Sequence, residues 1–464
     1  SNFFLRVLRA LRGKNIIQMD TYIKKTKIKA SVERVFSWHE RDGVIARLTP
    51  PWAPLEMVSR SGQGAEKGVR VKFRIKFFGI SMVWLAEHFD YEKNVVFKDR
   101  QLKGPFSVWE HTHRFIPDGE SVYEPNMFME DRVRFKLPFG LLSLPFYGLA
   151  KKEFERMFSY RHRVLKHDLE HDLVKGSKKR ILISGASGTI GKALVPFLRT
   201  CGHEVIRLVR KKDKLKKDEI FWDPYSATLD LDQAGPLDAV INLNGMDISR
   251  GKWSDVQKQK IIDSRVIPTS LLVEKMKGLK HKPKVFICAS AIGFYGEGGD
   301  SSLSESSSCG DFFISDVCRQ WEDAALAAES AGIRTVRLRI GIVLSLAGGA
   351  LARMALPFQL GCGVIIAEGR QYMSWISMDD AVSAILHILN SKEISGAVNL
   401  TAPVPVTNKE FSLSLARVFS KKVRFRLSKS IALLLWGQMG KETLLSGARV
   451  KPDKLLNSGF SFQH

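Results

Sequence analysis

Long hydrophobic runs and paired cysteines are both missing from this sequence, and each absence excludes a class of protein. No stretch of about 18 or more uncharged apolar residues occurs, so the sequence predicts no transmembrane helix. The cysteines show no paired spacing, and all five follow residue 200: Cys201, Cys288, Cys309, Cys318 and Cys362. This pattern is typical of reduced thiols in a cytoplasmic protein rather than of a disulfide framework.

Motifs for metal binding and secretion are missing as well. There is no CxxC pair, no HExxH and no dense Asp/Glu loop, so the motifs predict no metal site. Residues 1–18 are basic and partly apolar, but they lack an uninterrupted apolar core and a small-residue cleavage site, so they do not match a secretory signal. Met19 is a candidate natural start, which makes 1–18 an extension. A frayed tail is favoured there over a membrane-surface helix.

Acidic residues are few relative to basic ones. The chain has 72 Lys and Arg against 48 Asp and Glu, a formal net charge of +24. Such a charge favours anionic ligands. No recognised nucleic-acid-binding module and no aromatic-basic cluster accompanies it, so we predict no nucleic-acid partner. A general bias towards lysine and arginine on solvated faces explains the charge at least as well.

The chain is long enough for two or three domains with sizeable cores, since it has 464 residues, of which 44% are hydrophobic. Residues 19–173 form the first, with a pattern of strands followed by a long helix. The segment Val69–Phe77 alternates apolar and cationic residues, which predicts a half-buried antiparallel strand. The other expected strands are Ile23–Ile28, Met82–Phe89, Val95–Asp99, Val108–Phe115 and Met127–Phe135. Helical spacing from Pro145 to Leu173 completes an α+β domain whose sheet and helix enclose a cavity.

A short polar segment, 174–179, is the expected linker, and the pattern changes after it. Apolar strands alternate with longer helical stretches, which predicts an α/β domain with a doubly wound parallel sheet over 180–398. The expected strands are Arg180–Ser184, Glu204–Val209, Ala239–Leu243, Val285–Ala289 and Thr335–Ile340, and the expected helices are Thr189–Thr200, Asp255–Lys277 and Asp316–Ser330.

The first strand of this second domain runs into a glycine-rich turn with the sequence ISGASGTIG, residues 183–191. Gly185 allows a tight turn, Gly188 lets backbone approach a pyrophosphate, and Gly191 lets helix and strand pack closely. The following helix offers free N–H groups and a positive dipole to phosphates. The position of the turn, between the first strand and the first helix, therefore predicts a dinucleotide site.

The end of the second strand distinguishes between the two nicotinamide cofactors. An acidic residue there binds the ribose 2′-hydroxyl of NAD. This sequence has Arg207 and Arg210 instead, which suit the 2′-phosphate of NADP. Arg210 is the first choice and Arg207 the second, so the expected cofactor is NADP(H). The alternative is that both are solvated surface cations.

Several motifs of the second half together resemble the atypical, extended short-chain dehydrogenase/reductase family of NAD-dependent epimerase/dehydratase type, in the subgroup related to the human member 39U. They are ISGASGTIG (183–191), VINLNG (240–245), DSR (263–265), ASAIGFYG (289–296), VCRQWE (317–322), LRIGIVL (338–344) and MSWISMDD (373–380). The resemblance runs from Lys179 to the C-terminus. It implies a small C-terminal subdomain, taken as 399–464.

This resemblance implies further cofactor contacts. In the family the loop after the fourth strand lies against the cofactor, which carries over to Leu243, Asn244 and Gly245, although the family usually has alanine at Asn244. Ala289, at the end of the next strand, joins the expected set. The glycine turn contributes Gly185, Ser187, Gly188, Thr189, Ile190 and Gly191.

The first half resembles the START-like, helix-grip (SRPBCC) superfamily of hydrophobic-ligand binders. The stretches FKDRQLKGPF (97–106) and WEHTH (109–113) are similar to a motif of its cyclase/dehydrase-like members. The resemblance implies an apolar ligand in this domain, and fusions of the two modules are known in the epimerase-like family.

Working short-chain dehydrogenases pair a tyrosine with a lysine four residues later for proton exchange. Here the tyrosine position falls on Phe313 or Ile314 and the lysine position on Val317 or Cys318, so the pair is absent. The remaining catalytic candidates are Ser290 and Tyr295, on the loop leaving the strand Val285–Ala289. Ser290 is offset by one from the usual serine, and a structural role for both residues is favoured over catalysis.

Other polar residues have competing interpretations. Trp109, His111 and His113 alternate on one strand face, but a metal needs a third ligand and none is evident, so satisfied histidines are favoured. The pair Asp379-Asp380 resembles two general acids, while N-capping of a helix through Leu389 is the plainer interpretation. Arg265 faces the cofactor crevice in family members, and an ion pair on its helix is the alternative.

Three functional hypotheses follow. The first is an NADP(H)-dependent oxidoreductase or epimerase acting on an unknown small-molecule substrate. The second is a non-catalytic or redox-sensing NADP(H)-binding module. The third is handling of a lipid or polyketide-like molecule carried by the first domain. The sequence does not determine the substrate, the direction of reaction or the oligomeric state.

Overall fold

The computed structural model describes residues 19–464 except 54, 78–79, 120–125, 171–176 and 250. Internal contacts divide the chain into two compact units. Unit 1 comprises Ser1–Lys175 with Arg199–Gly202, and unit 2 comprises Gly176–Leu198 with His203–His464. The expected extension 1–18 and the first half of the expected linker 174–179 lie outside the described residues. Within the described residues, no helix is long and apolar enough to cross a membrane.

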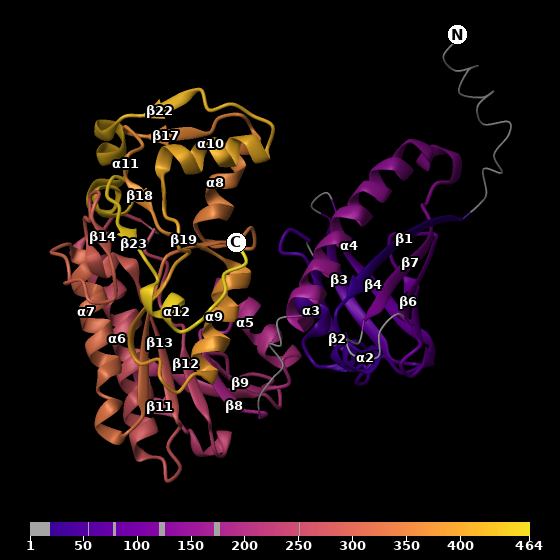
Figure 1. Ribbon diagram of the computed structural model, residues 1–464, viewed down its shortest axis with the longest axis horizontal. Helices are drawn as coiled ribbons and strands as arrows, with labels where there is room; N and C mark the ends of the chain where they lie inside the picture. Colours follow the sequence, from indigo (N-terminus) through magenta and orange to yellow (C-terminus); the bar gives the residue numbers. More distant parts are fainter. Residues whose placement is uncertain (1–18, 54, 78–79, 120–125, 171–176, 250) are drawn as a thin grey trace. The chain divides into compact units, whose positions relative to one another are not determined.

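Unit 1 is built on a seven-stranded antiparallel sheet with the order β1-β7-β6-β5-β4-β3-β2 (Figure 1). The strands are β1 (Asp20–Ile28), β2 (Leu55–Arg60), β3 (Arg70–Phe77), β4 (Ile80–Glu92), β5 (Val96–Lys103), β6 (Val108–Pro117) and β7 (Met127–Lys136). Six of these were predicted, β3 from its alternation and the other five as strand-like runs, while β2 was missed. The sequence LEMVSR of β2 lies at the sheet edge, mostly exposed, and therefore carries no buried/exposed alternation.

In the described part of unit 1, three helices accompany the sheet. The helices α2 (Val32–Glu40) and α3 (Val44–Leu48) connect β1 to β2 and were not predicted. The long helix α4 (Tyr147–Glu170) follows a 3-10 turn at Gly140–Phe146 that contains Pro145, so the predicted helix begins two residues later than expected. Its predicted end at Leu173 lies outside the described residues.

The core of unit 1 lies between the sheet and α4. Alternate residues of β6 are buried, and the aromatic side chains of α4 pack against that face. One cluster of buried residues consists of Tyr22, Trp109, Val133, Phe135, Phe154 and Phe158. The predicted sheet-plus-helix architecture of this half therefore has its core where the alternation placed it.

A buried ion pair between Arg47 and Asp168 connects α3 to α4. Arg47 donates through Nε to Asp168 Oδ2 at 3.0 Å and through Nη2 to Oδ1 at 2.8 Å. The side chains are 4% and 0% exposed. Burial alone raises the pKa of Asp168, but the Arg47 guanidinium outweighs it and holds that pKa below its usual 3.8.

We expect Arg47→Met to lower the free energy of unfolding by about 3–5 kcal/mol, because the Asp168 carboxylate loses its buried partner. The depressed pKa of Asp168 means that the pair stabilises the fold above pH 3.8 and that this contribution is lost as the pH falls below that value. Urea unfolding followed by circular dichroism measures both effects. Arg74→Met, which breaks the exposed Arg74–Glu56 pair, is the matched control and leaves stability nearly unchanged. Equal stability of the two variants would contradict the prediction.

Unit 2 contains an eight-stranded sheet with the order β11-β10-β9-β8-β12-β13-β15-β20. Its strands are β8 (Arg180–Ser184), β9 (Glu204–Val209), β10 (Glu219–Asp223), β11 (Thr228–Leu229), β12 (Ala239–Asn242), β13 (Val285–Ala291), β15 (Arg334–Ile340) and β20 (Gly396–Leu400). All neighbours are parallel except β10 and β11. The five predicted strands are confirmed, and β10, β11 and β20 were missed.

The sheet of unit 2 is covered on both faces, as a parallel sheet requires. Figure 1 shows α6 (Asp255–Gly278) and α7 (Phe313–Leu326) on one side and α5 (Thr189–Thr200) and α9 (Met378–Asn390) on the other. The predicted helix starts of α5 and α6 are confirmed. The helix α7 begins three residues before the predicted Asp316, because its first turn is made by apolar residues that pack inward.

A smaller lobe of unit 2 is assembled from segments on both sides of β20. The strand β17 (Val364–Ile366) pairs with β22 (Phe425–Leu427), and β18 (Tyr372–Met373) pairs with β21 (Val406–Thr407). The lobe also contains α8 (Gly349–Gln359), α10 (Asn408–Val418) and α11 (Lys429–Thr443). The expected boundary between 398 and 399 falls inside β20, so the subdomain 399–464 is not a separate contiguous piece.

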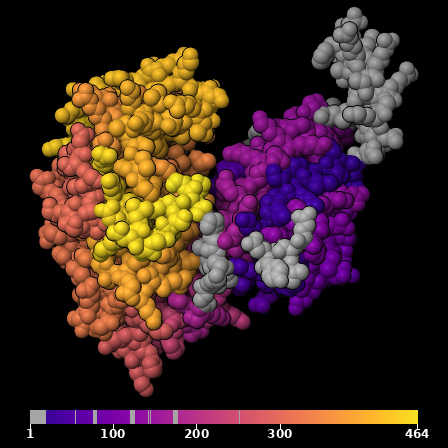
Figure 2. All heavy atoms as spheres, in the orientation of Figure 1, coloured from indigo at the N-terminus to yellow at the C-terminus, as the bar shows by residue number. Residues whose placement is uncertain are grey.

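The pair Asp379-Asp380 stands at the start of α9, but neither is the N-cap. That residue is Ser377, whose Oγ accepts from the Asp380 N–H at 2.9 Å. The buried Asp380 carboxylate accepts from the backbone N–H groups of Gln463 at 2.7 Å and His464 at 3.1 Å. It therefore holds the C-terminal segment, drawn in yellow over the orange part of unit 2 in Figure 2.

Candidate functional site

The candidate site lies where the strand order of unit 2 reverses. From β8 the chain moves outward to β9 and β10 and then returns to β12 on the other side of β8. The loops that leave β8 and β12 are therefore neighbours at the carboxyl edge of the sheet. An open parallel sheet binds ligands at such a switch point.

Two glycines of the turn after β8 are required by close backbone approach. Gly185 has a φ of +74°, and a Cβ there would lie 2.6 Å from the backbone C and O of Leu243. A Cβ on Gly191 would lie 2.4 Å from the Gly185 oxygen. The turn therefore lies tightly against the β12 loop and the start of α5, as the spacing of the glycines predicts.

The rest of the turn is open to solvent. Ser187 and Gly188 are exposed, Thr189 and Ile190 are half-buried, and α5 begins at Thr189. The first N–H groups of a helix have no partner within the helix. The turn therefore presents backbone donors and a positive dipole end to the crevice, an arrangement that suits a pyrophosphate.

The two arginines after the second strand differ in how they are engaged. Arg207 donates to Asp218 at 2.7 Å and is ion-paired with Glu219 at 2.8 Å. Arg210 is exposed, directly beyond the end of β9, and within the described residues it has no hydrogen-bond or ion-pair partner. The geometry favours Arg210 over Arg207 as a ligand for an added phosphate.

The loop after β12 is held by one buried amide. The Asn242 Oδ1 accepts from Ser184 Oγ at 2.8 Å and from Asn244 Nδ2 at 2.7 Å, and its Nδ2 donates to Thr269 Oγ1 at 2.8 Å. Asn242 thereby ties β8, the β12 loop and α6 together. The sequence analysis named Asn244 for a cofactor contact but did not single out Asn242. A polar residue inside an otherwise apolar strand is the feature of the sequence that could have pointed to it.

Arg265 of α6 lies beneath the same loop. It donates to the carbonyl oxygens of Ile261 at 2.9 Å and Met246 at 3.0 Å, and its guanidinium is 5.2 Å from the centre of the Trp321 ring. A Cβ on Gly245 would meet this guanidinium at 3.5 Å. Arg265 therefore supports the Leu243–Gly245 loop from below, and among the described residues it forms no ion pair with a carboxylate of its helix.

The segment before α8 borders the crevice on another side. A Cβ on Gly348 would lie 2.8 Å from Thr189 Oγ1, so this segment passes close to the start of α5. Arg353 of α8 is paired with Asp247 and Ser249 of the β12 loop. These contacts connect the smaller lobe to the loop at the switch point.

Ser290 and Tyr295 are integrated into a buried ion-pair network. Ser290 Oγ donates to Glu322 at 2.8 Å, and Tyr295 Oη donates to Asn399 at 2.6 Å while it accepts from Arg339 at 3.0 Å. Arg339 forms a bidentate ion pair with Glu322, in which Nε donates to Oε1 at 2.9 Å and Nη2 donates to Oε2 at 3.0 Å. Ser290 is 2% exposed and Tyr295 4% exposed. Burial also raises the pKa of Tyr295 above its usual 10.0.

These contacts favour a structural role for Ser290 and Tyr295 over the catalytic one, because both hydroxyls are engaged and neither is accessible. The usual proton-transfer positions are also apolar. Ile314 and Val317 are buried, and burial raises the pKa of the Cys318 thiol to about 12. The expected cofactor residue Ala289 is likewise buried inside β13, which continues to Ala291.

We expect Ser290→Ala and Tyr295→Phe each to lower the free energy of unfolding by about 1–3 kcal/mol, because each leaves buried polar partners unsatisfied. Affinity for NADPH should stay within about twofold of the wild type, since neither hydroxyl reaches the crevice. Urea unfolding and fluorescence titration provide the two measurements. Unchanged stability together with loss of a catalysed reaction would restore the catalytic assignment.

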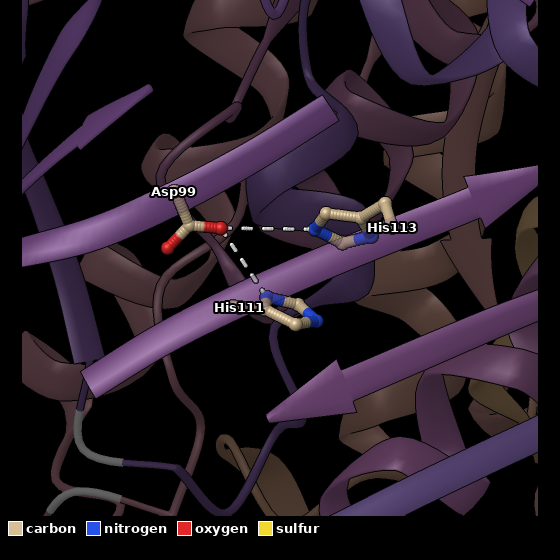
Figure 3. Close-up of side chains that lie close together, drawn as sticks. All are labelled: Asp99, His111 and His113. Carbon is tan, nitrogen blue, oxygen red and sulfur yellow. Dashed lines mark ion pairs between the residues drawn. The ribbon is translucent and has the colours of Figure 1, made fainter. Parts of the chain in front are cut away.

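A second polar cluster lies in unit 1. His111 and His113 are buried on β6, and Asp99 of β5 lies opposite His111 with one carboxylate oxygen facing both rings (Figure 3). The expectation that no third metal-ligating group accompanies the two histidines is wrong. Sequence reasoning missed Asp99 because the pairing register of β5 and β6, which aligns Asp99 with His111, cannot be read from either strand alone.

Two family models match this chain. The NAD dependent epimerase/dehydratase family matches residues 181–400, and a domain of unknown function (DUF1731) matches residues 430–464. An epimerase family protein of Mycobacterium leprae is 38% identical over 293 residues, which cover 63% of this chain and 94% of that protein. The human epimerase family protein SDR39U1 is 31% identical over 287 residues, covering 61% and 95%.

Two solved structures are also similar. One is described as the nucleoside-diphosphate sugar epimerase from Corynebacterium glutamicum; it is 30% identical, has a TM-score of 0.76, and the match covers 96% of this chain and 87% of that one. This match spans both units. The other is human SDR39U1 (isoform 2) with NADPH, 30% identical with a TM-score of 0.56, covering 61% of this chain and 95% of that one.

Proposed function

Because this chain belongs to the NAD-dependent epimerase/dehydratase family, we propose that unit 2 binds NADP(H) at the switch point and acts as an epimerase-like protein on a small substrate whose identity is open. The observation that carries this proposal is the turn Gly185–Gly191, which lies between β8 and α5 and directs its open backbone donors at the crevice. The human relative solved with NADPH supports the choice of cofactor.

Each part of the cofactor has residues that suit it. The pyrophosphate fits the turn at Ser187–Ile190, and the ribose and adenine side fits the loop Leu243–Gly245. The 2′-phosphate fits Arg210, whose planar guanidinium has no competing partner within the described part of the chain. Arg207 is a weaker candidate because two carboxylates already engage it. The bound cofactor supplies hydride exchange, and the residues named here position it.

The chain lacks the tyrosine and lysine that usually perform proton transfer in this family. The positions usually held by tyrosine and lysine carry Phe313 or Ile314 and Val317 or Cys318, which perform no proton chemistry here. This observation favours a second candidate function, a non-catalytic NADP(H)-binding or redox-sensing module. The two differ in whether the chain transfers hydride between its nicotinamide cofactor and a substrate, either as net oxidation of NADPH by a carbonyl compound or as an internal exchange that regenerates the cofactor.

For unit 1 we propose a START-like, helix-grip domain that holds an apolar ligand. The support is the element order, in which β1 is followed by two short helices, six strands and the long α4. Residues 19–173 form this domain in the proposal and 174–179 the linker. The expected NADP(H)-binding domain 180–398 is extended to include all of β20, so the family's C-terminal part, expected at 399–464, begins after Leu400.

We expect the chain to bind NADPH more tightly than NADH, and Arg210→Ala to weaken NADPH binding by about 10- to 100-fold while NADH binding changes little. The reason is the loss of a charge-assisted contact to the 2′-phosphate, which is worth about 1.5–3 kcal/mol. Titration followed by nucleotide fluorescence measures both constants.

The control for this titration is Lys280→Ala. Lys280 is an exposed cation just before β13, at the opposite edge of the sheet from the crevice, so its removal changes the net charge equally without touching the site. A similar loss of affinity in both variants would show a general charge effect and contradict the role of Arg210. Absence of binding by either nucleotide would overturn the cofactor assignment.

A screen of carbonyl substrates distinguishes the enzyme from the binding module. Oxidation of NADPH with any of them, measured by absorbance and abolished in a Gly191→Val variant that blocks the turn, would establish an oxidoreductase. Tight NADPH binding with neither net oxidation nor exchange of deuterium from labelled NADPH into any compound of the screen would favour the non-catalytic alternative.

A further inference from the structure

The inside of unit 1 contains a compact set of buried histidines and carboxylates that the proposed function of unit 2 does not use. Asp99 Oδ2 lies 3.3 Å from His111 Nδ1 and 3.8 Å from His113 Nε2. One ligating atom from each of the three residues lies within 4.8 Å of the others. Figure 3 shows the single Asp99 oxygen facing both imidazole rings.

We propose that Asp99, His111 and His113 bind one divalent transition-metal ion, with Zn²⁺ as the best fit. Zinc binds nitrogen and carboxylate oxygen at about 2.0–2.2 Å in tetrahedral geometry, which places neighbouring ligand atoms roughly 3.3–3.6 Å apart. Two of the separations, 3.3 and 3.8 Å, lie in or near this range, and all three ligand atoms lie within 4.8 Å of one another, so binding requires the side chains to close around the ion. Two imidazoles and one carboxylate are also the ligand types that borderline metals prefer.

The strand geometry explains why these three side chains converge. Residues i and i+2 of a strand point to the same face, which places both histidines of β6 on the side covered by α4. In the β5–β6 pairing Asp99 is directly opposite His111. An HxH pair on one strand with a carboxylate opposite on its neighbour is held by the sheet itself and not by a mobile loop.

A second carboxylate lies behind the proposed ligands. Asp131 of β7 bonds through Oδ1 to His111 Nε2 at 3.2 Å and through Oδ2 to His162 Nε2 at 2.7 Å. The His162 ring is fixed in turn by Thr26 at 2.7 Å. A carboxylate that receives the second ring N–H of a ligating histidine orients the imidazole and increases its basicity, which is the usual outer support of a metal site.

The alternative is a hydrogen-bonded network with no ion. Such a network leaves His113 Nε2 without a hydrogen bond within the described residues, because its ion-pair partner Asp99 Oδ2 is 3.8 Å away, while His113 Nδ1 lies 2.7 Å from Asp131 Oδ1. His113 is 8% exposed and therefore has little access to water. A metal ion at His113 Nε2 gives this imidazole a partner that the protein alone does not supply.

Three protein ligands leave a fourth position open, as in catalytic rather than structural zinc sites. Asp99, with its side chain 16% exposed, is the least buried of the three. The proposed ion therefore keeps one coordination position for water or for an oxygen atom of a small ligand. This inference concerns unit 1 alone and stands or falls independently of nucleotide binding in unit 2.

The test is titration of the chelator-treated full-length chain with Zn²⁺ by isothermal calorimetry, compared with Asp99→Asn and His113→Gln. Both substitutions nearly preserve side-chain shape. We expect one equivalent of Zn²⁺ to bind the wild type and each substitution to weaken its Kd by about 100-fold or more, beyond the usual effect of an outer-shell change. His281→Gln, at an exposed histidine of unit 2, is the matched control and retains full affinity.

Co²⁺ substitution in the wild type provides a readout that does not depend on how the variants fold. Tetrahedral nitrogen and oxygen ligands give visible bands without thiolate-to-metal charge transfer. Charge-transfer bands would instead assign the ion to cysteines such as the exposed Cys362 and would overturn the proposal. Absence of Zn²⁺ binding, or unchanged affinity in Asp99→Asn, would overturn it as well.

Discussion

The close backbone contact between the β8 turn and the β12 loop is the constraint on which the site in unit 2 depends. Gly185 and Leu243 approach so closely that no side chain fits between them, and Asn242 bonds to both segments from below. The segments that border the crevice are arranged around this contact. The start of α5 follows the turn directly, the Leu243–Gly245 loop lies against it, and the segment before α8 passes close to Thr189 at the start of α5.

A second organising interaction is the Glu322–Arg339 pair. It joins α7 to β15 and includes the hydroxyls of Ser290 and Tyr295, so the loop that leaves β13 is fixed by structural bonds. Burying such a pair is costly unless its remaining donors and acceptors are satisfied, and here they are. In this chain, residues that resemble catalytic ones in the sequence therefore belong to the internal support of the fold.

The strands and turns that could be predicted are those whose own residue pattern indicates the structure. Some patterns can be recognised from one segment alone: the alternating strands of unit 1, the glycine turn and the apolar strands of the parallel sheet. The edge strand β2 and the short strands of the smaller lobe have no such pattern, because they are strands only through pairing with a distant segment and not through a buried face. The same limit applied to the sites. Arg210 was named from its position in the chain, whereas the engagement of Arg207 and the approach of Asp99 to His111 depend on contacts between distant segments.

The interleaved smaller lobe has a consequence for how the protein forms as it is synthesised. β17 cannot pair until β22 has left the ribosome, and β18 must likewise wait for β21. The parallel sheet through β15 has all its strands earlier and is free to assemble first. Contacts between segments distant in sequence form slowly because their chain entropy must be overcome before they add stability. A ribosome stalled between residues 400 and 424 would therefore display a formed glycine turn beneath a lobe that is still open.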